Sequence, residues 1–109
     1  MELDITTEAG LGTVTVANAR IDAAVAIQFK DQMRELTRDA PDRIILNLSQ
    51  VEFIDSSGLG AIVAVMKSLR DGQRMELAAL SPAVDKVFRM TRMDSIFVIH
   101  ASADAAHNA

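Results

Sequence analysis

The chain has 109 residues, half of them hydrophobic and about a quarter charged, which is the composition of one globular domain rather than of a disordered segment. Its 15 acidic and 11 basic residues give a net charge of -4, and the basic residues are scattered, so we expect no nucleic-acid partner. The absence of cysteine excludes disulfides and cysteine-based zinc sites, and the two histidines, His100 and His107, have no ligand-like neighbours, so we expect no metal site.

Targeting and membrane signals are also missing from the sequence. No apolar run approaches the roughly 18 residues that a membrane-spanning helix needs. Residues 1–4 lack the basic start and apolar stretch of a signal peptide. We therefore expect a cytoplasmic protein with no membrane partner.

The N-terminal part of the chain predicts a hairpin followed by a helix. Apolar and polar residues alternate over residues 3–5 and again over residues 14–16, on either side of a turn at residues 10–12. From Ala23 to about Arg38 apolar residues recur at helical spacing, namely Val25, Phe29, Met33 and Leu36. The carboxylate of Asp22 is expected to cap this helix.

The remaining elements alternate between strands and helices. Residues 43–48 are apolar and β-branched, which is typical of a central buried strand. A second helix is predicted by the apolar stripe Leu59, Ile62, Val63, Met66 and Leu69. A strand over residues 75–80, a helix starting at Ser81-Pro82 and a strand over residues 96–99 complete the domain.

This order of elements predicts a single α/β domain. We expect residues 1–100 to form a mixed β-sheet of four to five strands with amphipathic helices packed mainly on one face. Residues 101–109 are small and polar enough to form a flexible tail.

Residues 55–60, Asp-Ser-Ser-Gly-Leu-Gly, stand where the second helix begins. The first backbone amides of a helix lack intrahelical acceptors and the helix dipole is positive there, so a phosphate on Ser56 or Ser57 would be tolerated. Gly58 and Gly60 have no side chains, which is expected to leave the helix start open to another molecule. The serines would then be within reach of a kinase.

A simpler interpretation is that Asp55 or a serine caps the helix and that the glycines only permit a tight turn. No base lies nearby in the sequence to activate either hydroxyl, and there is no Gly-x-Ser-x-Gly motif, so a hydrolase is not expected. No acid–base pair or metal set indicates an enzyme acting on a small molecule.

Residues 51–62 resemble the signature segment of the STAS-family anti-sigma-factor antagonists, in which an Asp-Ser-Ser/Thr-Gly-Leu-Gly run opens a helix. Residues 43–48 are similar to the family's central strand, and residues 80–88 to its Ser-Pro-x-Val helix. Ile21-Asp22 occupies the place of a Gly-x-Leu-Asp turn before the first helix. These stretches span most of the chain in the family's order, so the resemblance implies a STAS-like domain.

The resemblance also implies a partner switch and not an enzyme. In such antagonists the unphosphorylated form binds an anti-sigma serine kinase of the histidine-kinase-like ATPase class and thereby releases the sigma factor. Phosphorylation of the serine directly after the aspartate abolishes binding, and a PP2C-type phosphatase reverses it. That serine is Ser56 here, with Ser57 in reserve. The implied partner-binding residues are Asp22, Asp55, Ser56, Ser57, Gly58, Leu59 and Gly60. No cofactor is implied, because ATP is expected only as the substrate of the kinase.

The chain departs from the family at Ala19 and Arg20, where the antagonists usually have a glycine and often an acid. Alanine in a positive-φ turn costs about 1 kcal/mol, so this turn is expected to be shaped differently. Arg20 is expected to alter which partner is accepted. Asp22 has two compatible interpretations, a docking residue or a helix cap.

Two other functions compete with the antagonist. A phosphoaspartate receiver would use Asp55, but the acidic pair and the later lysine of receivers are missing. The other is a STAS scaffold or regulatory subunit of a signalling assembly or membrane transporter, which would have the same fold and a different role. The intact serine pair favours the phosphorylation-controlled antagonist. His100 is expected to be exposed and inert.

Overall fold

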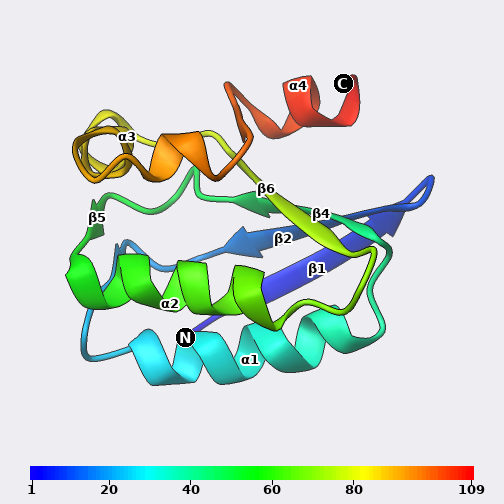
Figure 1. Ribbon diagram of the computed structural model, residues 1–109, viewed down its shortest axis with the longest axis horizontal. Helices are drawn as coiled ribbons and strands as arrows, with labels where there is room; N and C mark the ends of the chain where they lie inside the picture. Colours follow the sequence, from blue (N-terminus) through cyan, green and yellow to red (C-terminus); the bar gives the residue numbers. More distant parts are fainter.

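Five strands form the main sheet of the computed structural model, which describes residues 1–109 (Figure 1). In sheet order they are β1 (Leu3–Glu8), β2 (Leu11–Val16), β4 (Arg43–Asn47), β6 (Arg74–Ala78) and β7 (Ile99–His100). Only β1 and β2 pair in antiparallel fashion, and the other neighbours are parallel. The predicted mixed sheet is therefore confirmed, with the apolar segment 43–48 supplying the central strand.

A second, two-stranded sheet lies beyond the ends of the main one. It pairs β3 (Arg20–Ile21) in parallel with β5 (Phe53–Ile54). The sequence analysis predicts neither strand, and together they bring the segment before the first helix against the segment before the second.

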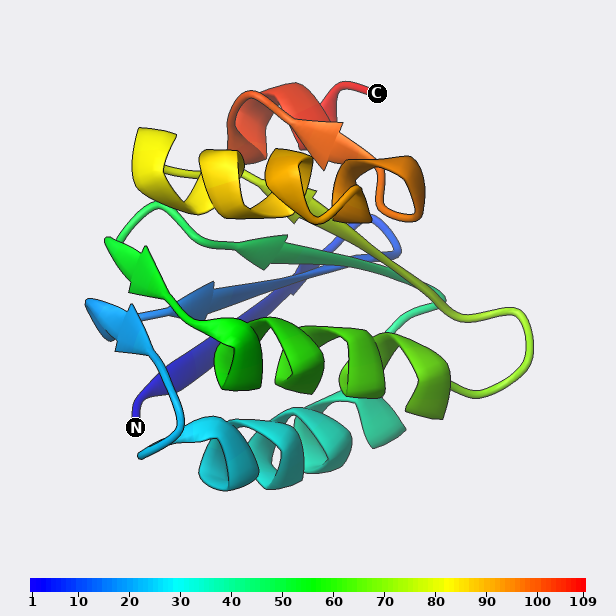
Figure 2. The same ribbon diagram turned by 60° about the vertical axis from the view of Figure 1, so that its left-hand side comes forward.

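Four α-helices and one short 3₁₀-helix complete the chain. They are α1 (Ala26–Arg38), α2 (Ser56–Ser68), α3 (Pro82–Met90), η1 (Met93–Ser95) and α4 (Ala103–His107). The first three connect parallel strands that advance in one direction across the sheet, so right-handed crossovers place all three on the same face. Figures 1 and 2 both show α1 and α2 side by side, beginning at the same end of the molecule.

The main core lies between this helical layer and the sheet. Fully buried side chains from α1, α2, α3 and the central strand fill it, among them Phe29, Ile62, Phe88, Ile44 and Leu46. Burial of each such side chain stabilises the fold by about 1.5–3 kcal/mol. The predicted stripe of α1 places Phe29 and Met33 in this core. The buried face of α2 is turned slightly from the predicted stripe, because Ala61 and Val65 are buried with Leu59 and Ile62 while the other stripe residues are only partly buried.

The opposite face of the sheet is polar apart from one small apolar cluster. That cluster consists of Leu11, Ile45, Ala78 and Ala106, and it is covered by α4. The hydroxyl of Thr13 lies 2.9 Å from His107 Nε2 and adds a polar contact to the same helix. Residues 101–109 therefore contain a helix packed on the sheet, where the sequence analysis expects a flexible tail.

Several boundaries differ from the sequence-based expectation. The hairpin turns at Ala9 and Gly10, both with positive φ as a tight two-residue turn requires, so Gly12 lies within β2. The last strand covers only two residues and starts later than predicted, because residues 96–97 form a turn after η1. None of the helices has the length and apolar character needed to span a lipid bilayer.

Candidate functional site

Asp55 organises the start of α2. It is the N-cap of the helix, and its Oδ1 accepts a hydrogen bond from the backbone N–H of Gly58 at 2.9 Å. Its Oδ2 accepts from the backbone N–H of Ala23 at 3.2 Å. The hydrogen bond from Gly58, supported by that from Ala23, outweighs partial desolvation and holds the pKa of Asp55 below its usual value. Asp55 is therefore a fixed anion and a poor proton acceptor.

Asp22 lies next to Asp55 but does not cap α1. Its Oδ1 accepts from the backbone N–H of Ala24 at 3.1 Å, which shapes a turn over residues 22–25. The helix begins only at Ala26, and its N-cap Val25 makes no side-chain cap hydrogen bond. The predicted capping role of Asp22 is wrong because this turn separates it from the first free amides of the helix. Asp22 remains available as a surface carboxylate.

The two glycines of the segment have different surroundings. A Cβ at Gly58 would collide with the carbonyl oxygen of Ile21, so this glycine allows β3 to approach the helix start. A Cβ at Gly60 would meet no atom within 4 Å, and Gly60 is exposed. The expectation that both glycines admit another molecule is wrong for Gly58, whose free space is taken by the chain itself. At Gly60 the expectation stays a prediction.

Ser56 and Ser57 are the exposed groups of the site. They occupy the first two positions of α2, and neither hydroxyl is hydrogen-bonded to another group of the chain. Leu59 is only 9% exposed and belongs to the main core. Leu59 and Gly58 thus offer no side-chain surface to a partner, in contrast to the sequence-based expectation, whereas both serines do.

Arg20 and Phe53 form a feature that the sequence analysis did not identify. The two residues are paired across β3 and β5, and the Arg20 guanidinium lies 4.1 Å from the centre of the Phe53 ring. Arg20 Nε also donates to Asp22 Oδ2 at 3.2 Å. Phe53 is 39% exposed, whereas the other three phenylalanines of the chain are buried. Only the strand pairing could have revealed this contact.

The turn at Ala19 carries no conformational penalty. Ala19 is absent from the residues with positive φ, so the expected cost of about 1 kcal/mol does not arise. Its carbonyl accepts hydrogen bonds from the N–H groups of Glu52 at 2.7 Å and Phe53 at 3.1 Å. Alanine fits this position because the backbone is held in an ordinary conformation by β5.

We give the name serine platform to the surface made by Phe53, Ser56, Ser57, Gly60 and the partly exposed Asp22 and Asp55, with Arg20 stacked on Phe53. It displays two hydroxyls beside two carboxylates and one guanidinium. Neither hydroxyl has a base within hydrogen-bond distance, and no group of three or more His, Cys, Asp or Glu residues is arranged to hold a metal ion. Both hydroxyls are therefore exposed at the helix start without a contact that fixes them.

Comparison with known proteins decides the family. The profile of the STAS domain matches residues 2–106. The chain belongs to the STAS domain family. BtrV of Bordetella bronchiseptica, which is named as a candidate anti-sigma factor antagonist, is 34% identical over 97 residues, covering 87% of this chain and 77% of BtrV. The resemblance of the serine segment to anti-sigma-factor antagonists is thus confirmed at the level of the whole domain.

Solved structures agree with this STAS assignment. An anti-sigma factor antagonist from Mycobacterium paratuberculosis superposes with a TM-score of 0.87 at 24% identity, covering 98% of this chain and 91% of that one. The anti-sigma factor antagonist SpoIIAA of Bacillus superposes in its unphosphorylated form with a TM-score of 0.77 at 22% identity, covering 98% of this chain and 94% of that one. At these identities the two structures establish the fold alone.

Away from the serine platform, this STAS domain contains a buried carboxylate. Glu76 of β6 accepts hydrogen bonds from Arg43 Nη2 at 2.8 Å and Arg74 Nε at 3.1 Å, and it lies 2.8 Å from His100 Nε2. Burial alone raises the pKa of Glu76, but these contacts outweigh it and bring the pKa to about 2. The side chain of His100 is only 14% exposed, so the prediction of an exposed histidine is wrong. Arg43 also donates to the Ala106 carbonyl at 2.9 Å, which ties the cluster to α4.

Proposed function

We propose that this STAS domain is an anti-sigma-factor antagonist controlled by phosphorylation of Ser56. The unphosphorylated protein binds an anti-sigma serine kinase of the histidine-kinase-like ATPase class and so releases the sigma factor. Phosphorylation by that kinase abolishes binding, and a PP2C-type phosphatase restores it. The observation that carries the proposal is the exposure of Ser56 and Ser57 at the start of α2, with both hydroxyls free of hydrogen bonds within the chain.

The choice of Ser56 rests on its position. It directly follows Asp55, as the modified serine does in the family that the sequence resembles. Ser57 is one residue further into α2 and is the reserve candidate. SpoIIAA has been solved in both a phosphorylated and an unphosphorylated form, which supports the idea that a STAS fold can carry the modification.

The charges around Ser56 supply the physical basis of the switch. A phosphate adds up to about two negative charges and three strong acceptors to a small neutral side chain. It would stand near the ionised Asp55 and the carboxylate of Asp22, whose charge is balanced only by the exposed Arg20. Desolvating this cluster in an interface would cost a few kcal/mol, which lowers affinity by about two decades or more.

The docking surface includes an aromatic anchor. Phe53 is partly exposed, and its ring is held in place by the Arg20 guanidinium above it. Aromatic and arginine side chains contribute much of the binding energy at protein interfaces. We therefore assign Phe53 to the kinase contact together with the serines. Arg20, where relatives often have an acid, favours a kinase with an acidic side chain at the facing position.

The test uses a histidine-kinase-like ATPase from the same cells, purified and mixed with this protein and ATP. Mass spectrometry locates the phosphate, and calorimetry measures the affinity of the two proteins. We expect Ser56→Ala to bind the kinase but resist phosphorylation, and Ser57→Ala to be phosphorylated normally. Ser56→Asp should bind at least about a hundredfold more weakly, with an unchanged circular dichroism spectrum.

Three outcomes would count against the proposal. Full labelling of the Ser56→Ala protein would move the modification to another residue. Failure of a PP2C-type phosphatase to remove the phosphate would exclude the assigned reversal step. Recovery of a transporter subunit or a large signalling assembly, with no ATPase-type kinase, would favour the scaffold role instead.

A further inference from the structure

An open cleft lies at the far end of the helical layer from the serines. It is bounded by the C-terminal turns of α1 and α2 and by the loop after α2, and its volume is about 400 Å³. Its lining residues are all polar or charged: Arg34, Thr37, Arg38, Ser68, Arg70 and Gln73. We call it the arginine cleft. The 13 residues of α2 separate it from Ser56 by about 18 Å.

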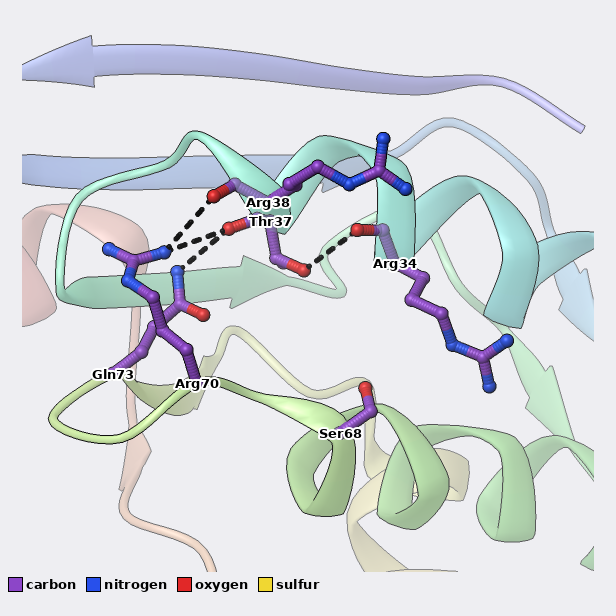
Figure 3. Close-up of a pocket in the computed structure, with 6 residues that line it drawn as sticks. All are labelled: Arg34, Thr37, Arg38, Ser68, Arg70 and Gln73. Carbon is purple, nitrogen blue, oxygen red and sulfur yellow. Dashed lines mark hydrogen bonds between the residues drawn. The ribbon is translucent and has the colours of Figure 1, made fainter.

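One wall of the arginine cleft is fixed by hydrogen bonds to the end of α1. Arg70 Nη2 donates to the Ala40 carbonyl at 2.7 Å and to Asp42 Oδ1 at 3.0 Å, and Gln73 Nε2 donates to the Thr37 carbonyl at 2.9 Å. Figure 3 shows Arg70 and Gln73 turned toward the carbonyl groups at the end of α1. The Arg70 and Gln73 side chains are therefore held in place by these hydrogen bonds and form a fixed wall of the cleft.

Arg34 and Arg38 make no such structural hydrogen bonds with their guanidinium groups. In Figure 3 the guanidinium groups of Arg34 and Arg38 carry no hydrogen bond to the other cleft residues. Arg34 is 4.0 Å from the carboxylate of Asp31, and Arg38 forms no ion pair. The two residues are four positions apart on α1, where like charges repel. The negative end of the α1 dipole favours Arg38 in the last turn, but Arg34 lies outside that turn.

The free donors determine the class of ligand. Guanidinium groups bind the oxygens of phosphate through paired, charge-assisted hydrogen bonds. None of the six lining residues is hydrophobic and none carries a carboxylate, so a cation would find no oppositely charged side chain there. The protein as a whole carries a charge of -4, so a general attraction for anions does not account for binding at this place.

We propose that the arginine cleft binds a small phosphate-bearing anion through Arg34 and Arg38. In Figure 3 the two guanidinium groups extend in different directions, so both flexible side chains have to turn into the cleft for one anion to contact both. The volume of about 400 Å³ admits a phosphate group with a small substituent or a second phosphate. This binding is independent of the serine platform, because none of the residues is shared.

The experiment titrates the full chain with inorganic pyrophosphate and, separately, with orthophosphate, at constant ionic strength set by sodium chloride. Calorimetry gives the affinity, and two-dimensional NMR shows which backbone amides shift. We expect saturable binding, with the shifted amides in the last turns of α1 and α2. Tighter binding of pyrophosphate would indicate a ligand with two phosphates, and equal binding a single phosphate group.

Two pairs of variants test the assignment. Arg34→Gln with Arg38→Gln should weaken pyrophosphate binding at least about tenfold. Lys86→Gln with Arg92→Gln removes the same charge from exposed residues that form no ion pair, and should change affinity by less than about twofold. If the first pair does not fold, Arg34→Lys with Arg38→Lys keeps the charges but loses the paired hydrogen bonds, and should still weaken binding. Absence of saturable binding to the unaltered protein, or equal losses in the two neutralised pairs, would overturn the proposal.

Discussion

The carboxylate of Asp55 accepts a hydrogen bond from the backbone N–H of Ala23 at 3.2 Å, joining two segments that lie 32 residues apart. Its other oxygen caps α2 through Gly58. One side chain thus holds the turn before α1 against the start of α2. A partner that touches the Asp22 turn and Ser56 therefore meets one continuous surface.

Replacing Asp55 should loosen this junction without unfolding the domain. In Asp55→Ala we expect amide hydrogen exchange at Ala23 and Gly58 to accelerate by roughly an order of magnitude, because both N–H groups lose their acceptor. NMR exchange rates measure this directly. Asp85→Ala, which removes a carboxylate paired with Arg89 on α3, is the control and should leave both amides unchanged. If the Ala23 amide exchanged as slowly in Asp55→Ala as in the unaltered protein, the hydrogen bond to Asp55 would not be what protects it.

Replacing each of the two glycines by alanine should change the free energy of unfolding in opposite directions. Gly58→Ala should destabilise the protein by about 2–4 kcal/mol, because the new methyl group collides with the Ile21 carbonyl and separates β3 from α2. Gly60→Ala points into open space within a helix and should stabilise by up to about 1 kcal/mol. Urea unfolding of the two variants checks both values. Equal stabilities would show that the backbone at Gly58 yields easily.

The buried carboxylate of Glu76 predicts an acid-sensitive component of stability. Its pKa is about 2 in the folded protein against an ordinary value of 4.5, so folding favours the ionised form. The resulting contribution, about 3 kcal/mol, is complete above pH 4.5 and is lost as the pH falls toward 2. The groups facing it are Arg43, Arg74 and His100. Urea unfolding at a series of pH values follows the loss.

Two variants isolate the Glu76 contribution. Glu76→Gln cannot ionise, so its stability should be lower than that of the unaltered protein near neutral pH and should fall less between pH 4.5 and 2. Asp71→Asn removes an exposed carboxylate that forms no ion pair, and should keep the original pH profile. The same steep acid profile in Glu76→Gln and in the unaltered protein would assign the sensitivity to other groups.

The docking of α4 can be tested at neighbouring alanines. Ala106 is completely buried against the sheet, whereas Ala105 is exposed. Ala106→Glu should destabilise the protein by about 2 kcal/mol, because the helix must detach to hydrate the new charge. Ala105→Glu should change stability by less than about 0.5 kcal/mol. Chemical denaturation measures both, and equal values would mean that α4 adds nothing to the fold.

The sequence predicts the elements that have a periodic pattern. The apolar stripe from Leu59 to Leu69 and the apolar segment 43–48 both form the expected structures, because burial of their side chains dominates their folding. The exposure of Ser56 and Ser57 also agrees with the sequence-based expectation, since a polar helix start has no core to enter.

What the sequence could not predict depends on contacts between distant segments. β3 and β5 have two residues each, too few for any alternation to be visible. The helix α4 is short and rich in alanine, and it is held by Ala106 and by the Arg43 hydrogen bond to that residue's carbonyl. The burial of Glu76 follows from the strand register, which places Arg43 and His100 around it.

The Ile21 carbonyl lies so close to Gly58 that β3 packs directly against the turn that carries the serines and restrains it. Under the proposed function, phosphorylation would then change the charge at one point of the surface. The partner would respond to that charge without a conformational change in the domain. The rate of the response would be set by the rates at which the kinase and the phosphatase act on Ser56, and not by a structural change in the domain.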